Sequence, residues 1–258
     1  MTAGPALARV LPRPLLGRLV RALYPRLEPE LARIDEFVPR GGTAVDAGGW
    51  FGPWTRSLLA RADRVVTIEA DPTMARMLAR TFPRAEVIAA AVSEFPGTAA
   101  FAATPGTRLA GTSKVTGTAP RGGTAVLEAD VPGGEGQAVP CVRIDDLGLT
   151  DVGFLKLDIE GHELPALRGA AETVRRDRPV ILLELEARHQ PVAPVVALLE
   201  SWGYLGEVLV AGEWTPLAEF DLEGHQRACV GDLDRGFLRR ALRPEPRYIN
   251  SVLFRSRA

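Results

Sequence analysis

The pattern of apolar and polar positions changes near residue 41. Residues 1–40 mix apolar and polar side chains at helical spacing, which predicts an N-terminal helical segment. Beyond it, short apolar runs alternate with amphipathic stretches. Strands are expected at 43–47, 64–69 and 86–92, and helices at 53–62 and from 71 onward. This β-α-β-α-β order predicts an α/β fold with a parallel, doubly wound sheet and helices on both faces.

The second half of the chain repeats this alternation after an interruption. Residues 104–138 are rich in Gly, Thr, Ala and Pro with little periodicity, so we expect a flexible insertion on the substrate side. Strands and helices are then expected in alternation, with the last two strands as an antiparallel pair: strands at 139–143, 153–158, 179–185, 204–210 and 248–255, and helices at 163–175 and 192–202. The predicted organisation is an N-terminal helical cap, residues 1–40, and one α/β domain, residues 41–258.

Composition narrows the class of protein. The formal net charge of -1 gives no reason to expect nucleic-acid binding, and no apolar run is long enough to cross a membrane. Pro12 and Pro14 interrupt any signal-peptide core. Cys141 and Cys229 lack zinc-ligand spacing and suit a reducing cytoplasm, the expected location. An amphipathic helix over 15–23 is expected to cover the active site or to contact a second subunit, which leaves a homodimer open.

The first chemistry-bearing motif is a glycine-rich turn after the first strand. Asp46, Gly48 and Gly52 follow the spacing D-x-G-x-x-x-G, which differs from the dinucleotide fingerprint. Glycines allow a tight turn and let a ligand lie against the backbone. Asp46 would repel a pyrophosphate, whereas S-adenosylmethionine carries a sulfonium and an ammonium group and no phosphate. A tight turn without a ligand is the alternative for this motif taken alone.

Three further motifs place acidic side chains at later strand ends. Glu69 lies 17 residues after Gly52, near the spacing of an acidic ribose ligand. Asp158 ends another strand, and His162 follows as a candidate general base, although it could equally face solvent. Glu184 and Glu186 share one face of the next strand, with His189 beyond. With Asp158 these two glutamates form a candidate site for a hard divalent cation, against the simpler alternative of solvated strand ends.

At this point the chain resembles the FkbM family of S-adenosylmethionine-dependent methyltransferases over about residues 40–255. The resemblance rests on VDAGGWFGPWT, IEADP, FLKLDIEGHELPALRGA, RPVILLELE and YINSVLF. It implies a class I methyltransferase, Rossmann-like sheet of seven strands with the last strand antiparallel. It also implies methyl transfer to a hydroxyl of a small natural product or sugar in bacterial secondary metabolism. The chain departs from the family's usual pattern at Trp50, Pro53, Trp54 and Glu186.

The resemblance also implies roles for individual residues. Glu69 would bind the ribose, and Met74 and residues 91–93 would flank the adenine. Asp158 would lie beside the amino-acid part of the cofactor or the acceptor. The implied cofactor-binding set is Asp46, Gly48, Gly52, Thr55, Glu69, Ala70, Met74, Ala91, Val92 and Asp158.

We expect an in-line displacement in which positioning supplies much of the acceleration. His162 is the first candidate for the base and Asp158 the second. Alternatives are a metal-assisted reaction on Asp158, Glu184 and Glu186, methylation of nitrogen, and a non-catalytic cofactor-binding subunit. An NAD-dependent dehydrogenase is disfavoured by the glycine spacing and by Asp46.

Overall fold

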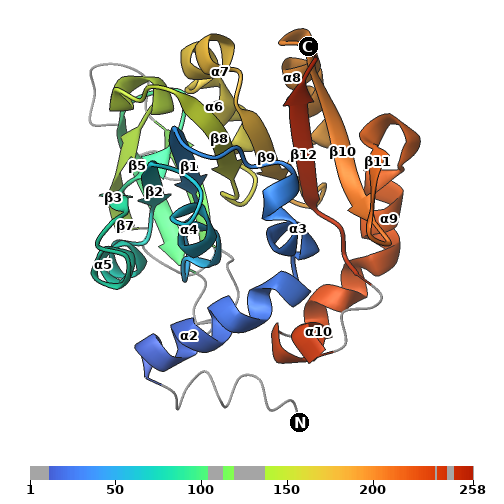
Figure 1. The fold of residues 1–258 in the computed structure, drawn as a ribbon, viewed down its shortest axis with the longest axis horizontal. Coiled ribbons are helices and arrows are strands. Elements are labelled where there is room, and N and C mark those ends of the chain that lie inside the picture. Colours follow the sequence, from blue (N-terminus) through green and yellow to red (C-terminus); the bar gives the residue numbers. More distant parts are fainter. Residues whose placement is uncertain (1–11, 104–112, 119–136, 236, 243–246, 258) are drawn as a thin grey trace.

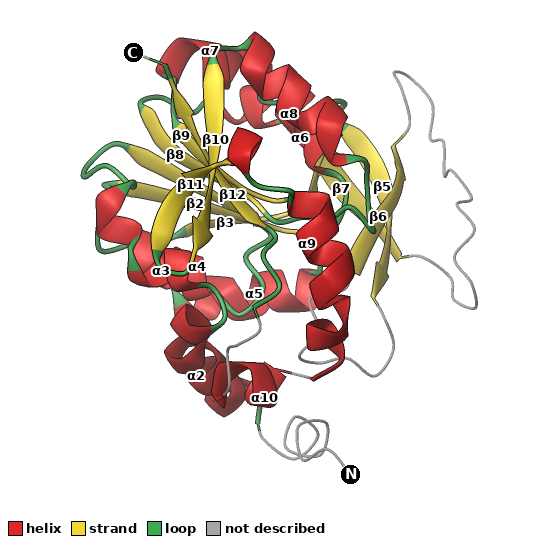
Figure 2. Ribbon diagram, turned by 90° about the vertical axis from the view of Figure 1, so that its right-hand side faces the viewer, coloured by secondary structure: helices red, strands yellow, loops and turns green. Residues whose placement is uncertain are grey.

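We describe the protein from a computed structural model, in which residues 12–103, 113–118, 137–235, 237–242 and 247–257 are described. In that part of the chain a large mixed sheet lies between layers of helices, and a smaller sheet lies beside it (Figures 1 and 2). The strands are β1 (Thr43–Ala47), β2 (Arg64–Glu69), β3 (Glu86–Ala89), β4 (Ala91–Val92), β5 (Gly97–Ala103), β6 (Ser113–Thr118), β7 (Gln137–Val142), β8 (Val152–Leu157), β9 (Val180–Glu184), β10 (Tyr204–Val210), β11 (Glu213–Pro216) and β12 (Ser251–Ser256).

Helices precede, connect and follow these strands. The α-helices are α2 (Arg13–Leu23), α3 (Pro29–Ala32), α4 (Pro53–Leu58), α5 (Pro72–Thr81), α6 (Glu163–Arg168), α7 (Ala171–Asp177), α8 (Val192–Ser201), α9 (Leu222–Cys229) and α10 (Phe237–Leu242). Short 3₁₀ turns are η1 (Tyr24–Arg26), η2 (Ile34–Glu36), η3 (Ile144–Leu147), η4 (Leu217–Glu219) and η5 (Val230–Arg235). None of the helices in the described ranges is both long and apolar enough to span a membrane.

The main sheet confirms the predicted α/β class with one addition. Its eight strands run in the order β11-β10-β12-β9-β8-β1-β2-β3. β1, β2, β3, β8 and β9 are parallel, and β12 pairs antiparallel with both β9 and β10. The predicted seven-stranded sheet is therefore present, and the short strand β11 extends it because the turn after β10 folds it back antiparallel.

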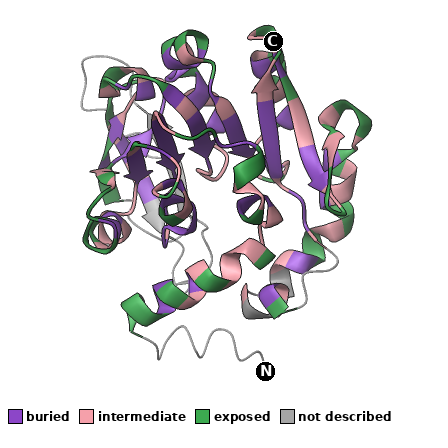
Figure 3. Ribbon diagram, in the orientation of Figure 1, coloured by how far each residue is buried: buried purple, intermediate pink, exposed green. Residues whose placement is uncertain are grey.

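Two apolar layers cover the main sheet. On one face, alternate residues of the strands pack against α6, α7 and α8, as Leu155, Leu157 and Leu183 do. On the other face, Phe154, Leu182 and Leu253 pack against the N-terminal segment and α4. The central strands are consequently buried along their length (Figure 3). The parallel strands end at the edge where α2, α3 and α10 lie (Figure 1).

The smaller sheet corrects two expectations. It contains four strands in the order β4-β7-β5-β6, so the strand predicted over 86–92 divides into β3 in the large sheet and β4 in the small one. β6 lies inside the segment predicted to be a flexible insertion, because it pairs with β5. The rest of that insertion, apart from residues 137–138, which begin β7, lies outside the described residues.

The prediction of a single helix over 163–175 is wrong, because α6 ends at Arg168 and α7 begins at Ala171. A side chain cannot be accommodated between them: a Cβ on Gly169 would lie 2.1 Å from the carbonyl oxygen of Ser93. This contact packs the end of α6 directly against the residue that follows β4.

We expect Gly169→Ala to lower the free energy of unfolding by about 1–3 kcal/mol, because backbone must move to relieve the overlap. Urea unfolding at constant pH measures this change. Gly231→Ala is the matched control, because a Cβ at Gly231 meets nothing within 4 Å. Equal stability of the two variants would contradict the close packing at Gly169.

Candidate active site

The glycine turn after β1 touches the end of β8. Gly48 has φ 88°, and a Cβ there would lie 1.9 Å from the main-chain oxygen of Asp158. The amide of Asp158 also donates to the carbonyl of Ala47 at 3.0 Å. Glycine is needed at 48 both for its positive φ and for this close approach. The structure thereby brings the first and third sequence motifs together.

Glu69 holds the same turn from the end of β2. One carboxylate oxygen accepts from the amide of Trp50 at 2.8 Å, and the other accepts from the amide of Asp71 at 2.8 Å. Burial raises the pKa of Glu69 to about 7, against the opposing effect of these two amides. Each carboxylate oxygen has a second lone pair, so both still have capacity to accept from a ligand hydroxyl.

Asp46 lies beneath the turn, in the interior. It is 1% exposed, and its Oδ2 accepts from the hydroxyl of Thr55 at 2.6 Å. Its Oδ1 has no hydrogen-bond partner among the described residues. Burial raises its pKa, while the nearby ammonium of Lys156 acts in the opposite direction. Asp46 and Thr55, both in the predicted cofactor-binding set, are therefore hydrogen-bonded to each other in the interior.

Lys156, to which the sequence analysis gave no role, is the cation of this interior site. It is 3% exposed, pairs across the sheet with Asp46, and donates to Asp158 Oδ2 at 2.7 Å. Burial would lower the pKa of Lys156, but Asp158, Asp46 and Glu28 raise it above its ordinary value. Burial would likewise raise the pKa of Asp158, yet Lys156 and its hydrogen bonds keep it below its ordinary value. Asp158 is therefore ionised at neutral pH.

The two glutamates at the end of β9 form a network with the residue that precedes the last strand. Asn250 donates to Glu184 and, at 3.1 Å, to Glu186. His189 lies 3.2 Å from Glu186 and 3.1 Å from Glu160, and Arg188 pairs with Glu186. Across the described ranges, no three His, Cys, Asp or Glu residues are arranged to hold a metal ion. Burial and the nearby Asp158, with which it shares a hydrogen bond, raise the pKa of Glu184, whereas Glu186 contacts the cations. The sequence analysis missed Asn250 and Glu160, although both lie in motifs that it quoted.

His162 lies on the side of β4 rather than on this network. Its Nε2 lies 2.9 Å from the hydroxyl of Ser93, the residue that follows β4. Burial lowers the pKa of His162, so the imidazole is neutral near pH 7 and able to accept a proton.

The other residues of the predicted cofactor-binding set, which include those expected beside the adenine, pack in two apolar clusters or in the core. Ala91 and Val92 are 2% and 3% exposed, so chiefly their main chain remains for a ligand. Ala70 packs against the cluster that contains Ala91, and Met74 packs against the apolar cluster beside Phe51.

The two unusual tryptophans of the turn contact the N-terminal segment. The ring of Trp50, at φ 46°, lies 5.7 Å from that of Tyr24 and 6.2 Å from that of Phe237 in α10. The indole N–H of Trp54 donates to Glu28 Oε2 at 2.7 Å. These contacts explain why large residues occupy a turn in which smaller ones are usual.

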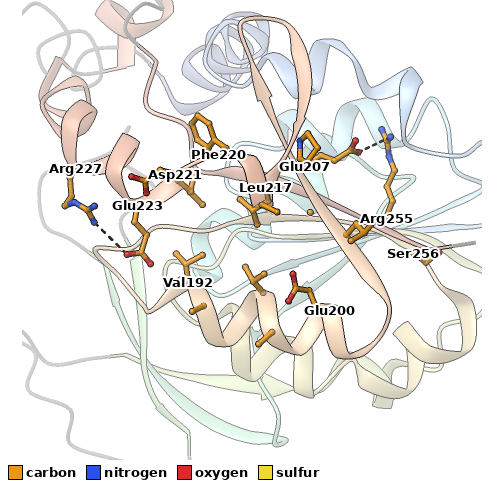
Figure 4. A pocket seen from close by; sticks show the side chains of 18 residues that line it. Val192, Glu200, Glu207, Leu217, Phe220, Asp221, Glu223, Arg227, Arg255 and Ser256 are labelled. Carbon is orange, nitrogen blue, oxygen red and sulfur yellow. Dashed lines mark ion pairs between the residues drawn. The ribbon is translucent and has the colours of Figure 1, made fainter.

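A separate groove lies between α8, β10, β11 and α9 (Figure 4). Its volume is about 730 Å³, and its lining includes Val196, Leu217 and the ion pairs Glu207–Arg255 and Glu223–Arg227. No residue of the glycine turn or of the strand ends β2 and β8 lines it. The groove is therefore distinct from the candidate active site.

Glu163 fixes the loop after Asp158 and provides a pH-dependent test. Its Oε1 accepts from the amides of Ile159 and Gly161 at 3.2 and 3.3 Å, and burial raises its pKa from 4.5 to about 7. The folded protein thus keeps a proton that the unfolded chain has released between these values. Its contribution makes the unfolding free energy fall as pH rises through this window.

Between pH 4.5 and 7, we expect the unfolding free energy of Glu163→Gln to fall by about 1–3 kcal/mol less than that of the wild type. Chemical unfolding at a series of pH values measures it. Glu172→Gln, an exposed position in α7, serves as the control and should keep the wild-type slope. Parallel profiles for wild type and Glu163→Gln would contradict the raised pKa.

Two solved structures align with the chain. A crystal structure of a methyltransferase FkbM from Methylobacillus flagellatus KT aligns with a TM-score of 0.45 and 19% identity, over 68% of this chain and 42% of that chain. The chain thus spans less than half the length of that protein. A precorrin 8w decarboxylase from Methanobacterium thermoautotrophicum aligns with a TM-score of 0.41 and 11% identity, over 92% and 89% of the two chains.

None of the curated protein sequences compared with the chain matches it. The family comparison is decisive, because the methyltransferase FkbM domain matches residues 35–205, well over half of the chain. Its range contains the glycine turn, Glu69, Lys156, Asp158 and the two glutamates at the end of β9. The chain therefore belongs to the FkbM methyltransferase family.

Proposed function

We propose that the protein transfers the methyl group of S-adenosylmethionine to a hydroxyl oxygen of a small natural product or sugar in bacterial secondary metabolism. The observation that carries this proposal is the contact of Gly48 with the main chain of Asp158. It joins the turn that would carry the cofactor to the carboxylate that would meet the acceptor. A small-molecule acceptor fits this arrangement, because the polar groups converge at one sheet edge.

The chemistry of the residues at the turn fits this cofactor. Asp46 and Asp158 lie beside a single lysine, and Asp46 Oδ1 lacks a partner in the described structure. A phosphate-bearing cofactor would meet repulsion here, whereas a cationic one is favoured. Glu69 would accept hydrogen bonds from the ribose hydroxyls. The glycines at 48 and 52 shape the turn that would carry the cofactor, because a Cβ at 48 would meet the Asp158 carbonyl oxygen and one at 52 would lie 2.3 Å from the ring of Phe82. Met74, Ala70 and the main chain of Ala91 and Val92 would border the adenine.

When bound, S-adenosylmethionine supplies a methyl group already activated on sulfur, so the protein has to align the acceptor and receive its proton. Asp158 is ionised and lies against the glycine turn, where the acceptor would meet the methyl group, although its lowered pKa makes it a weak base. His162 is neutral but hydrogen-bonds to Ser93 on the β4 side. Position therefore favours Asp158 over His162 as the base, the reverse of the order expected from the sequence.

Binding measurements test the cofactor. We expect isothermal titration to show S-adenosylmethionine binding and no NAD binding. Glu69→Gln should weaken the affinity by about tenfold or more, since a charge-assisted hydrogen bond to each ribose hydroxyl is lost. Glu86→Gln is the control, because Glu86 is an exposed residue of β3 that pairs with Arg64. Binding of NAD in place of S-adenosylmethionine would refute the proposal.

Release of S-adenosylhomocysteine in the presence of a panel of hydroxyl-bearing acceptors tests the reaction. We expect Asp158→Asn to lower turnover by about 10²–10⁴-fold, because the proton acceptor is removed. His162→Ala should lower it by less than about tenfold, since a residue outside the proton transfer loses only packing and polar contacts. A larger loss in His162→Ala than in Asp158→Asn would restore His162 as the base. Turnover with amines alone would show nitrogen methylation.

A further inference from the structure

The N-terminal segment brings a carboxylate into the interior of the candidate active site. Glu28 follows η1, and its two oxygens accept from the hydroxyl of Tyr24 at 2.7 Å and from the indole of Trp54 at 2.7 Å. Both donors are neutral, so these hydrogen bonds hold Glu28 in place without cancelling its charge. Neither Glu28 nor Tyr24 lies in the segment matched by the family domain, residues 35–205.

Glu28 interacts electrostatically with residues of the central strands. Lys156 and Asp158 both act on its charge, and Glu28 acts on Lys156 together with Asp46. We call these four residues, Glu28, Asp46, Lys156 and Asp158, the Lys156 cluster. It contains three carboxyl groups and one ammonium group. The direct ion pair within the cluster joins Lys156 to Asp158, at 2.7 Å.

A second observation shows that the cluster is incomplete. Asp46 is 1% exposed, and its Oδ1 has no hydrogen-bond partner in the described structure. A buried carboxylate oxygen without a partner is unfavourable unless another positive charge lies nearby. Burial raises the pKa of both Glu28 and Asp46, as expected for carboxyl groups that lack sufficient positive charge.

We propose that Glu28 is a binding residue for the positive charge of the cofactor, and that the N-terminal segment completes the cofactor site by delivering it. This inference rests on the proposed use of S-adenosylmethionine. The cationic sulfonium offsets the carboxylate excess of the Lys156 cluster, while the neutral sulfur of S-adenosylhomocysteine does not. The cluster therefore favours the charged substrate form of the cofactor over its uncharged product form. Trp54 and Tyr24 are the residues that position Glu28.

Three probes separate charge recognition from folding. They are S-adenosylmethionine, sinefungin, which carries an amine in place of the methylsulfonium group, and S-adenosylhomocysteine, which is neutral at sulfur. We expect Glu28→Gln to weaken binding of the two cationic ligands about 5–10-fold more than binding of S-adenosylhomocysteine, as loss of one screened charge predicts. Isothermal titration at constant pH and salt measures all three affinities. A purely structural role would change them equally.

Glu36→Gln is the matched control. Glu36 belongs to the same N-terminal segment and also accepts from an indole, that of Trp214 at 2.9 Å, but this contact is exposed and lies away from the Lys156 cluster. We expect its three affinities to stay within about twofold of wild type, because an exposed pair contributes little. If Glu28→Gln unfolds, Trp54→Phe provides the second variant. It removes the indole donor and keeps a smaller aromatic ring. It should reduce the ratio of cationic to neutral ligand affinity to a smaller extent than Glu28→Gln.

The outcomes are distinguishable. An unchanged ratio of cationic to neutral ligand affinity in Glu28→Gln, or in Trp54→Phe if the first variant unfolds, overturns the inference while leaving the cofactor assignment intact. An equal change of the ratio in Glu36→Gln also overturns it, because any charge in the segment would then suffice. If the wild-type protein binds none of the three ligands, the proposed function itself is contradicted.

Discussion

The candidate site depends on the close approach of two strands' ends at Gly48 and Asp158. β1 and β8 are neighbours in register, and the turn leaving β1 lies directly on the main chain that leaves β8. A methyl group at position 48 would occupy the space of the Asp158 carbonyl oxygen. Because the contact is between backbones, no side-chain rearrangement can relieve it. The chain at this edge therefore keeps the glycine turn and the Asp158 carboxylate at a fixed separation.

This arrangement places charged groups where the sheet is otherwise apolar. Lys156 and Asp46 lie on the same face as Phe154 and Leu182, which belong to the core. Burial of an ammonium group costs several kcal/mol unless carboxylates surround it. Removing one partner would leave an uncompensated charge. Elements that contact the cluster therefore have to satisfy its polar groups without adding a further charge. That constraint gives a physical reason for the indole of Trp54 and the phenol of Tyr24, which hold Glu28 without adding charge.

Much of the fold follows from local pattern. The periodic segments and acidic strand ends predicted the parallel strands, the turn after β1 and the meeting of Asp46, Glu69 and Asp158 at one edge, because parallel strands end on the same side. What could not be predicted depends on contacts between distant segments. The break between α6 and α7 comes at Gly169, where Ser93 lies too close for a side chain. β6 forms in a Gly- and Thr-rich stretch because β5 offers an edge. The pairing of His162 with Ser93 spans 69 residues and leaves no local signal.

Contacts between distant segments also join the matched domain to the segments outside it. The matched domain, residues 35–205, contains the turn and the strand ends that would carry the cofactor. Three groups around them come from outside it: Glu28 on the N-terminal segment, Asn250 before β12, and Phe237 in α10, whose ring faces Trp50. Each contacts a residue that departs from the family's usual pattern, namely Trp54, Glu186 or Trp50. These three positions of the domain are therefore in contact with segments outside it. We expect these flanking segments to influence selectivity for the acceptor, because they contact the residues around the glycine turn and the end of β9.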